Sequence, residues 1–170
     1  MASLPTDLVA AELAVRTAIA AKWAALPDAG VVHNRERWTG NMATYLKLIA
    51  TQDAANGNKT VLRGAFVKLV RFAPMVGDSA VCKTPVLLGY ELDVIYQFED
   101  LRKDTSNSSD GFNALLMAGH HAFENDQELG YTDLTHNFLN TAEDAEILLF
   151  DDVFCHRITL SLDCEVYVNG

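Results

Sequence analysis

Three residues near the middle of the second half of the chain, His120, His121 and Glu124, have the side-chain types of a metal site. On a helix, His120 and Glu124 would lie one turn apart on the same face and could share a cation. His121 would point about 100° away from His120, and the pattern is not the H-E-x-x-H of zinc peptidases. A third ligand would have to come from His136 or His156 through folding. We therefore expect no metal site, and a metal-dependent enzyme built on these residues stays as an alternative.

Cys155 and His156 form the second pair with chemical potential, because a thiol activated by an imidazole is a common nucleophile. Both lie in a predicted strand, where neighbouring side chains point to opposite faces, so the two groups cannot meet. The other cysteines, Cys82 and Cys164, complete an odd set without C-x-x-C spacing. With no secretion signal in view, this set indicates reduced thiols that serve as small packing residues.

Other catalytic and binding motifs are absent from the sequence. The acidic clusters at 143–146 and 151–152 lack the spacing and the turn glycine of an EF-hand. There is no G-x-G-x-x-G, no G-x-x-x-x-G-K-[ST] and no G-x-S-x-G. We expect no catalytic residue and no cofactor.

Charge is distributed unevenly along the chain. Residues 1–85 hold ten Lys/Arg and six Asp/Glu, whereas residues 86–170 hold three Lys/Arg and seventeen Asp/Glu, which gives +4 and −14 within a total of −10. The acidic half argues against general nucleic-acid binding, because phosphate contacts need cations. It favours a surface that repels a polyanion or docks a basic partner. A well-solvated acidic face is the alternative.

Apolar periodicity predicts the elements that would position these groups. A helix capped by Thr6 or Asp7 is expected to run to about Leu26, and a shorter helix capped by Thr39 is expected to follow. A third helix covers 109–127, with Gly119 at a close approach to a neighbouring element. Strands are predicted at 31–33, 61–72, 89–99, 147–150 and 156–168, while residues 130–144 are predicted to be a loop.

The last strand gives the clearest pattern. Its two parities separate into an apolar set and a polar set: Ile158, Leu160, Leu162, Cys164, Val166 and Val168 against Arg157, Thr159, Ser161, Asp163, Glu165 and Tyr167. Such alternation predicts a sheet with one buried and one polar face. A polar sheet face without a catalytic motif suggests a surface for another subunit or a lumen.

Together these patterns predict one α+β domain over residues 1–170. Its sheet is expected to be mainly antiparallel, with about four to five strands, a long N-terminal helix and a second helix packed on one face. The cations Arg63, Lys68 and Arg71 fall within strand 61–72, which indicates an edge or an exposed face. No run of about 18 apolar residues occurs, so no membrane span is expected.

Several stretches, taken in order, carry a family resemblance. They are VVHNRERW at 31–38, the Asn-Gly turn at 56–58 with VLRG at 61–64, and the run from GY at 89–90 through the helix at 112–123 to VFCH at 153–156. Over about residues 7–168 their order resembles small tail-assembly proteins of long-tailed phages and prophages, of the tail terminator or tail-completion type.

This resemblance implies an α+β subunit of a hexameric ring that caps the tail tube and joins it to the head–tail connector. The implied partners are further copies of the chain, the tail tube protein and the connector protein, and DNA passes through the lumen without specific binding. The implied location is the tail or neck of a virion assembled in the host cytoplasm.

The resemblance also implies roles for several charged residues. Glu91, Asp93, Asp163 and Glu165 are candidates for the lumen or a partner-facing surface, and Arg63, Lys68 and Arg71 are candidates for the subunit interface. The long loops at 74–85 and 101–110 would grip tube or connector proteins. A head-closure or neck connector protein, and a monomeric adaptor for a basic partner, remain alternatives.

Overall fold

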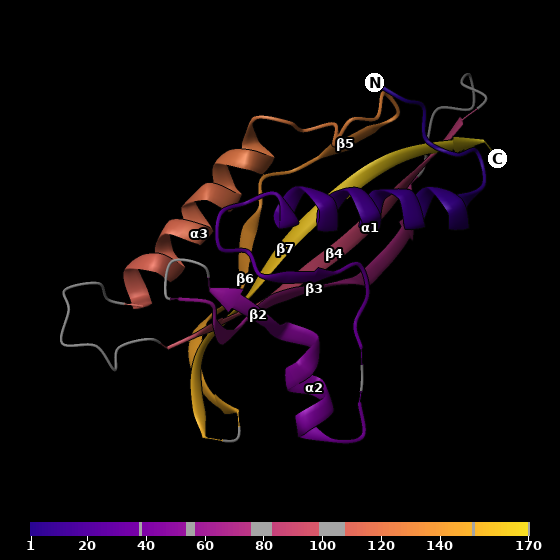
Figure 1. Ribbon diagram of the computed structural model, residues 1–170. Helices are drawn as coiled ribbons and strands as arrows, with labels where there is room; N and C mark the ends of the chain where they lie inside the picture. Colours follow the sequence, from indigo (N-terminus) through magenta and orange to yellow (C-terminus); the bar gives the residue numbers. More distant parts are fainter. Residues whose placement is uncertain (38, 54–56, 76–82, 99–107, 151, 170) are drawn as a thin grey trace.

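In a computed structural model of the chain, the described residues are 1–37, 39–53, 57–75, 83–98, 108–150 and 152–169. The protein is α+β, with three helices and a mixed sheet of seven strands (Figure 1). The helices are α1 (Leu8–Ala24), α2 (Met42–Ile49) and α3 (Ser108–Glu124). The strands are β1 (Val31–His33), β2 (Ala50–Asp53), β3 (Lys59–Pro74), β4 (Lys83–Gln97), β5 (Leu134–His136), β6 (Asn140–Phe150) and β7 (Val153–Asn169).

The sheet is built around three long antiparallel strands, β3, β4 and β7, which cross the whole molecule (Figure 1). β1 pairs with β3 in parallel orientation. β2 pairs with the first residues of β3 in antiparallel orientation. On the other side, β6 and β5 pair with successive parts of β7. The class and the long N-terminal helix are confirmed, but the sheet has more strands than the four to five predicted.

The predicted loop at 130–144 is wrong, because it contains β5 and the start of β6. Residues 140–146 are all exposed and show no apolar alternation, so side-chain pattern gives no strand signal there. Backbone pairing with β7 defines this strand instead, and it passes through two register shifts. Most of the two predicted loops at 74–85 and 101–110 falls on 76–82 and 101–107, outside the described residues.

One sheet face is covered by α1 and α3 and forms the main core. Asp7 caps α1, since its carboxylate accepts a hydrogen bond from the Ala10 N–H at 2.9 Å. The apolar set predicted for the last strand is buried on this face, with every member at most 6% exposed. The small side chains of α1 let it lie close to the sheet, and Tyr90 of β4 reaches the Glu12 carbonyl oxygen at 3.3 Å.

Gly119 marks the closest approach of α3 to α1. A Cβ atom at this position would lie 2.5 Å from Cζ3 of the buried Trp23. The predicted close approach is confirmed, and the neighbour is the indole of α1.

The second sheet face carries α2 at one end. Ile49 of this helix packs with Leu62, Phe66, Ile95 and Cys155 in a separate, smaller core. The cap of α2 is Asn41, whose side-chain oxygen accepts from the Thr44 N–H at 2.9 Å, so Thr39 is not the cap as predicted. α2 is short, and it leaves much of this face without a helix over it (Figure 1). Among the described residues, no helix is long and apolar enough to cross a membrane.

Candidate functional site

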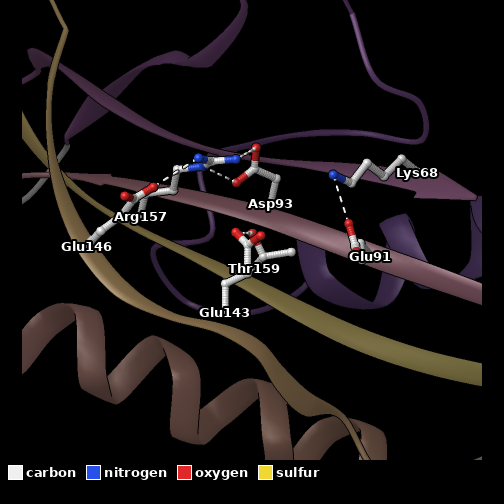
Figure 2. Close-up of polar contacts among 7 residues, drawn as sticks. All are labelled: Lys68, Glu91, Asp93, Glu143, Glu146, Arg157 and Thr159. Atoms are coloured by element: carbon white, nitrogen blue, oxygen red, sulfur yellow. Dashed lines mark hydrogen bonds and ion pairs between the residues drawn. The ribbon is translucent and has the colours of Figure 1, made fainter. Parts of the chain in front are cut away.

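The exposed part of the second sheet face is polar and is organised by ion pairs between neighbouring strands (Figure 2). Lys68 of β3 and Glu91 of β4 are directly opposite each other, and their side chains meet at 2.8 Å. The hydrogen bond that Lys68 donates to the Glu91 carboxylate raises the pKa of Lys68 above its ordinary value. Both side chains are more than a quarter exposed, so the pair adds little to stability and mainly fixes where the charges lie.

Arg157 is the centre of a second group that joins three strands. Its Nε and Nη2 atoms bond the two carboxylate oxygens of Asp93 at 2.6 and 3.1 Å, and Nη1 bonds Glu146 at 2.9 Å (Figure 2). The hydrogen bonds that Arg157 donates to the Asp93 carboxylate raise the pKa of Arg157, so this guanidinium stays charged. Sequence reasoning singled out Asp93 but missed Arg157 and Glu146. The position of Arg157 in the polar set of the last strand could have indicated that it lies on the polar face with Asp93.

The acidic candidates fall into two kinds. Glu91 and Asp93 are paired within the subunit, whereas Asp163 and Glu165 form no ion pair among the described residues. Glu165 accepts a hydrogen bond from the Tyr167 hydroxyl, which raises the pKa of that phenol. Asp163 and Glu165 are half-buried on β7, toward the end of the strand away from α2. Net negative charge on this face is therefore concentrated at that end.

The three cations predicted for a subunit interface also differ. Arg63 is buried, with its side chain 7% exposed, and its guanidinium contacts Asp28 at 2.8 Å and Asp53 at 3.3 Å. It also lies 4.6 Å from the centre of the Tyr96 ring. The expectation of an exposed Arg63 is wrong because β1 and β2 both pair with this part of β3 and cover it.

Arg71 has the exposed position that the sequence predicted. It lies beside Gly89 of β4, where a side chain would collide with the Arg71 Cβ atom at 2.8 Å. Within the described part of the chain it has no ion pair. Lys68 is half-buried next to it along the same strand. Of the three cations predicted for the interface, Lys68 and Arg71 therefore lie at the surface of β3, and Arg63 does not.

Both edges of the sheet carry unpaired backbone. From Val67 onward, no described strand pairs with the outer side of β3, and β6 has a described strand partner only in β7. Large apolar side chains are exposed along both edges: Leu69, Val70 and Phe72 on β3, and Ile147 and Leu149 on β6. Exposed strand edges of this length are sites where another chain can add a strand.

A cavity of about 340 Å³ lies on the polar face beside α2. Its apolar part is formed by Tyr45, Phe66 and Phe150, whose rings stack at 5.7 and 6.0 Å from the central Tyr45. Burial raises the pKa of Tyr45 to about 12, so its hydroxyl stays protonated. The charged wall of the cavity includes Glu36 and Arg37 together with three residues that are engaged in the ion pairs described above: Lys68, Asp93 and Arg157.

The histidines proposed for a metal site do not converge. His121 lies 3.8 Å from Glu124 at the surface, while His136 contacts the backbone oxygens of Asn137 and Asp126 at 2.6 and 2.9 Å. His156 is stacked between Phe98 and Phe112, with ring centres 4.2 and 5.0 Å away. Within the described residues, no group of three or more His, Cys, Asp or Glu side chains could hold a metal ion.

The two described cysteines are free and buried. Burial raises the pKa of Cys155 to about 11 and shifts that of Cys164 in the same direction, which disfavours the reactive thiolate. Cys82 lies outside the described residues.

The site is therefore a charged sheet face bounded by two open edges. No protein-family model and no curated protein matches the chain.

Proposed function

We propose that the chain is a structural virion protein, a ring subunit of the tail terminator type that caps a phage tail tube and joins it to the head–tail connector. The observation that supports this proposal best is the open state of the sheet at both edges. A monomer with two such edges exposes unpaired N–H and C=O groups together with apolar side chains. Self-association through the edges would pair these backbone groups and bury these apolar side chains.

The two edges differ, and this determines the kind of assembly expected. One edge is the second half of β3 and the other is β6, so a contact between them is heterologous, with different surfaces on the two copies. A heterologous contact repeats from copy to copy and closes into a ring when the rotation per copy divides a full turn. The family resemblance supplies the expected copy number of six.

The charge of the polar face suits a bore through which DNA passes. Asp163 and Glu165 add negative charge and form no ion pair within the described part of the subunit, although Arg71 lies across Gly89 from Asp163. Glu91 and Asp93 are paired with Lys68 and Arg157. Such a wall repels phosphate, so DNA would slide without specific binding. This part of the proposal places the polar face toward the lumen.

Mass measured by light scattering across a concentration series, with negative-stain imaging of the largest species, tests the proposal. Closed rings of six copies with a central hole are the expected result. A chain that stays monomeric at every concentration, or that forms a compact dimer and no larger species, would contradict it.

Mixing the ring with purified tail tube protein and, separately, with connector protein distinguishes the related roles. A terminator is expected to bind the tube end and halt its growth. Binding to the connector alone would favour the head-closure or neck alternative. Salt-sensitive binding of a basic protein by a monomer would favour the adaptor.

A further inference from the structure

We propose that residues 140–147 of β6 in one copy add as an antiparallel strand to the free half of β3 in the next copy, with Glu146 opposite Lys68 and Glu143 opposite Arg71, up to the point where β1 already pairs with β3. This inference rests on the proposed ring function and names the surface that builds it. The occupant of each edge is thus a second copy of this chain. Five observations support it: charge, strand direction, spacing, burial of apolar groups and stagger.

The two edges carry opposite charge. Residues 140–150 contain Glu143, Asp144 and Glu146 and no basic residue, while residues 67–75 contain Lys68 and Arg71 and no acidic residue. Pairing either edge with a second copy of itself would set like charges against each other, which is unfavourable. Pairing β6 with β3 sets unlike charges together and selects the heterologous contact.

Strand direction favours the same contact. β3, β4, β7 and β6 are neighbours in this order and each is antiparallel to the next, so β3 and β6 run in opposite directions within one copy. In a ring whose axis lies roughly along the strands, all copies keep the same orientation. β6 of one copy then meets β3 of the next in antiparallel orientation, and the alternation of the sheet continues through the contact.

The spacing of the charges matches because both strands carry an extra residue. Lys68 and Arg71 are three residues apart, yet the irregularity between Leu69 and Arg71 sets them opposite Glu91 and Gly89, which share one face of β4. Glu143 and Glu146 are likewise three apart and sit opposite Thr159 and Arg157, which share the polar face of β7. Opposed residues of an antiparallel pair point to the same side, so both charge pairs form on the polar face.

The same register brings apolar groups together on the other face. With Glu146 opposite Lys68, Ile147 is opposite Val67. Val67 belongs to the main core. Ile147 lies on the core side of the sheet, opposite His156 of β7, but it is 59% exposed in the isolated subunit. Docking would therefore extend the core across the contact and cover an exposed isoleucine.

The register also requires a plausible stagger. Within one copy Glu146 is level with Arg157, Ile95 and Gly64, so placing it beside Lys68 of a neighbour shifts the strands by four residues of β3. Four residues span about 13 Å along a strand, and four strands span about 19 Å across the sheet. Their ratio corresponds to a strand tilt of about 35°, which lies in the range of closed β-barrels.

A charge exchange tests the Arg71–Glu143 contact. Arg71→Glu and Glu143→Arg are each expected to raise the concentration at which half the chains are assembled by at least about tenfold, because each sets like charges together. The double variant is expected to recover to within about threefold of the wild type. Lys47→Glu in α2 and Glu124→Arg in α3 make the same changes of charge at exposed helix positions outside both edge strands, and they should leave assembly unchanged.

A disulfide tests the register directly. Opposed residues have Cα atoms about 4.5–5.5 Å apart, which a disulfide can bridge. Within one copy, β4 and β7 separate β3 from β6, so the bond forms only between copies. In a Cys82→Ser background, Arg71→Cys with Glu143→Cys should give, on oxidation, a ladder of dimer, trimer and higher species that ends at the closed ring. Arg71→Cys alone should give no ladder.

The outcomes separate this inference from the proposed function. Rings that form normally in both charge-reversed variants, with no ladder from the double cysteine, overturn the edge contact and leave the ring standing. Crosslinked dimers without higher species indicate a two-fold contact and also overturn it. A wild-type chain that never assembles contradicts both proposals.

Discussion

The guanidinium of Arg63 is held inside one subunit by groups from separate segments. Asp28 lies just before β1, Asp53 ends β2, and the Tyr96 ring comes from β4. Arg63 and Asp53 are both nearly inaccessible, with side chains 7% and 5% exposed. Arg63 therefore ties the small strands β1 and β2 to the long sheet and is not available to a neighbouring copy.

Replacing Arg63 should show this structural role. Arg63→Ala removes the cation from the buried Asp53 carboxylate, so we expect a loss of about 3–5 kcal/mol in the free energy of unfolding. Lys47→Ala, at an exposed position of α2, should change it by less than about 0.5 kcal/mol. Urea unfolding of dilute protein, followed by circular dichroism, measures both. Equal effects from the two variants would show that the Arg63 cluster contributes nothing to stability.

At the scale of elements, the contact between α1 and α3 depends on a missing side chain. Alanine is usually better than glycine inside a helix by roughly 1 kcal/mol. At Gly119, however, the added methyl group would meet the Trp23 ring at 2.5 Å, and Trp23 is fully buried. Steric crowding should outweigh helix propensity here.

Gly119→Ala is therefore expected to lower stability, by about 1–3 kcal/mol, despite its better helix propensity. Gly40→Ala is the matched control, since a Cβ atom there meets nothing within 4 Å and its backbone is not in the left-handed region. Thermal unfolding reports both variants, and the near-ultraviolet signal of tryptophan reports displacement of the Trp23 ring. A stabilised Gly119→Ala variant would mean that α3 moves away from α1 at little cost.

Lys22 and Asp126 connect the same two parts of the molecule through an ion pair of 2.5 Å. The hydrogen bond from Lys22 lowers the pKa of Asp126 below its ordinary value of 3.8. A carboxyl with a lowered folded-state pKa contributes stability above its unfolded pKa and loses it as pH falls through the folded value.

Stability of the wild type should therefore fall more steeply between about pH 5 and pH 3 than that of Lys22→Met, in which the long apolar stem is kept. The Asp126 side chain is 43% exposed, so solvent reduces the effect and only the difference in slope is predicted. Urea unfolding at several pH values measures these slopes, with Lys47→Met as control. Parallel curves for wild type and Lys22→Met would contradict the coupling.

The elements that could be read from sequence are those whose burial follows a period. The apolar parity of β7 and the long N-terminal helix are confirmed, because one-sided burial leaves a visible pattern, as at Val15 and Ile19 of α1. β5 and residues 140–146 of β6 were missed, and for β6 the reason is the opposite one: it is exposed along most of its length and is defined by backbone pairing with β7. The partners of Arg63 and Arg157 were also hidden, since they come from segments distant in the chain.

At the scale of the whole molecule, the two sheet faces differ in how far helices cover them. α1 and α3 close the main core on one face, while α2 covers one end of the other (Figure 1). Asp163 and Glu165 of β7 lie toward the opposite end of that second face. A closed ring of such subunits presents either a helical or a polar wall to its bore. The acidic end of the polar face gives the two arrangements different behaviour toward DNA.

Wild-type rings are expected to bind no duplex DNA at moderate salt, since the acidic wall repels phosphate. Asp163→Lys with Glu165→Lys would reverse that charge, so we expect DNA binding that weakens steeply as salt is raised. Glu124→Lys with Glu128→Lys makes the same change of charge in and just after α3, on the helical side of the molecule. Fluorescence anisotropy of labelled linear DNA, with imaging to confirm that each variant still forms rings, compares them. If the Asp163/Glu165 variant binds DNA and the Glu124/Glu128 variant does not, the polar face would be placed toward the bore. Equal binding by both variants would contradict that placement, because outer surfaces of either kind would then account for it.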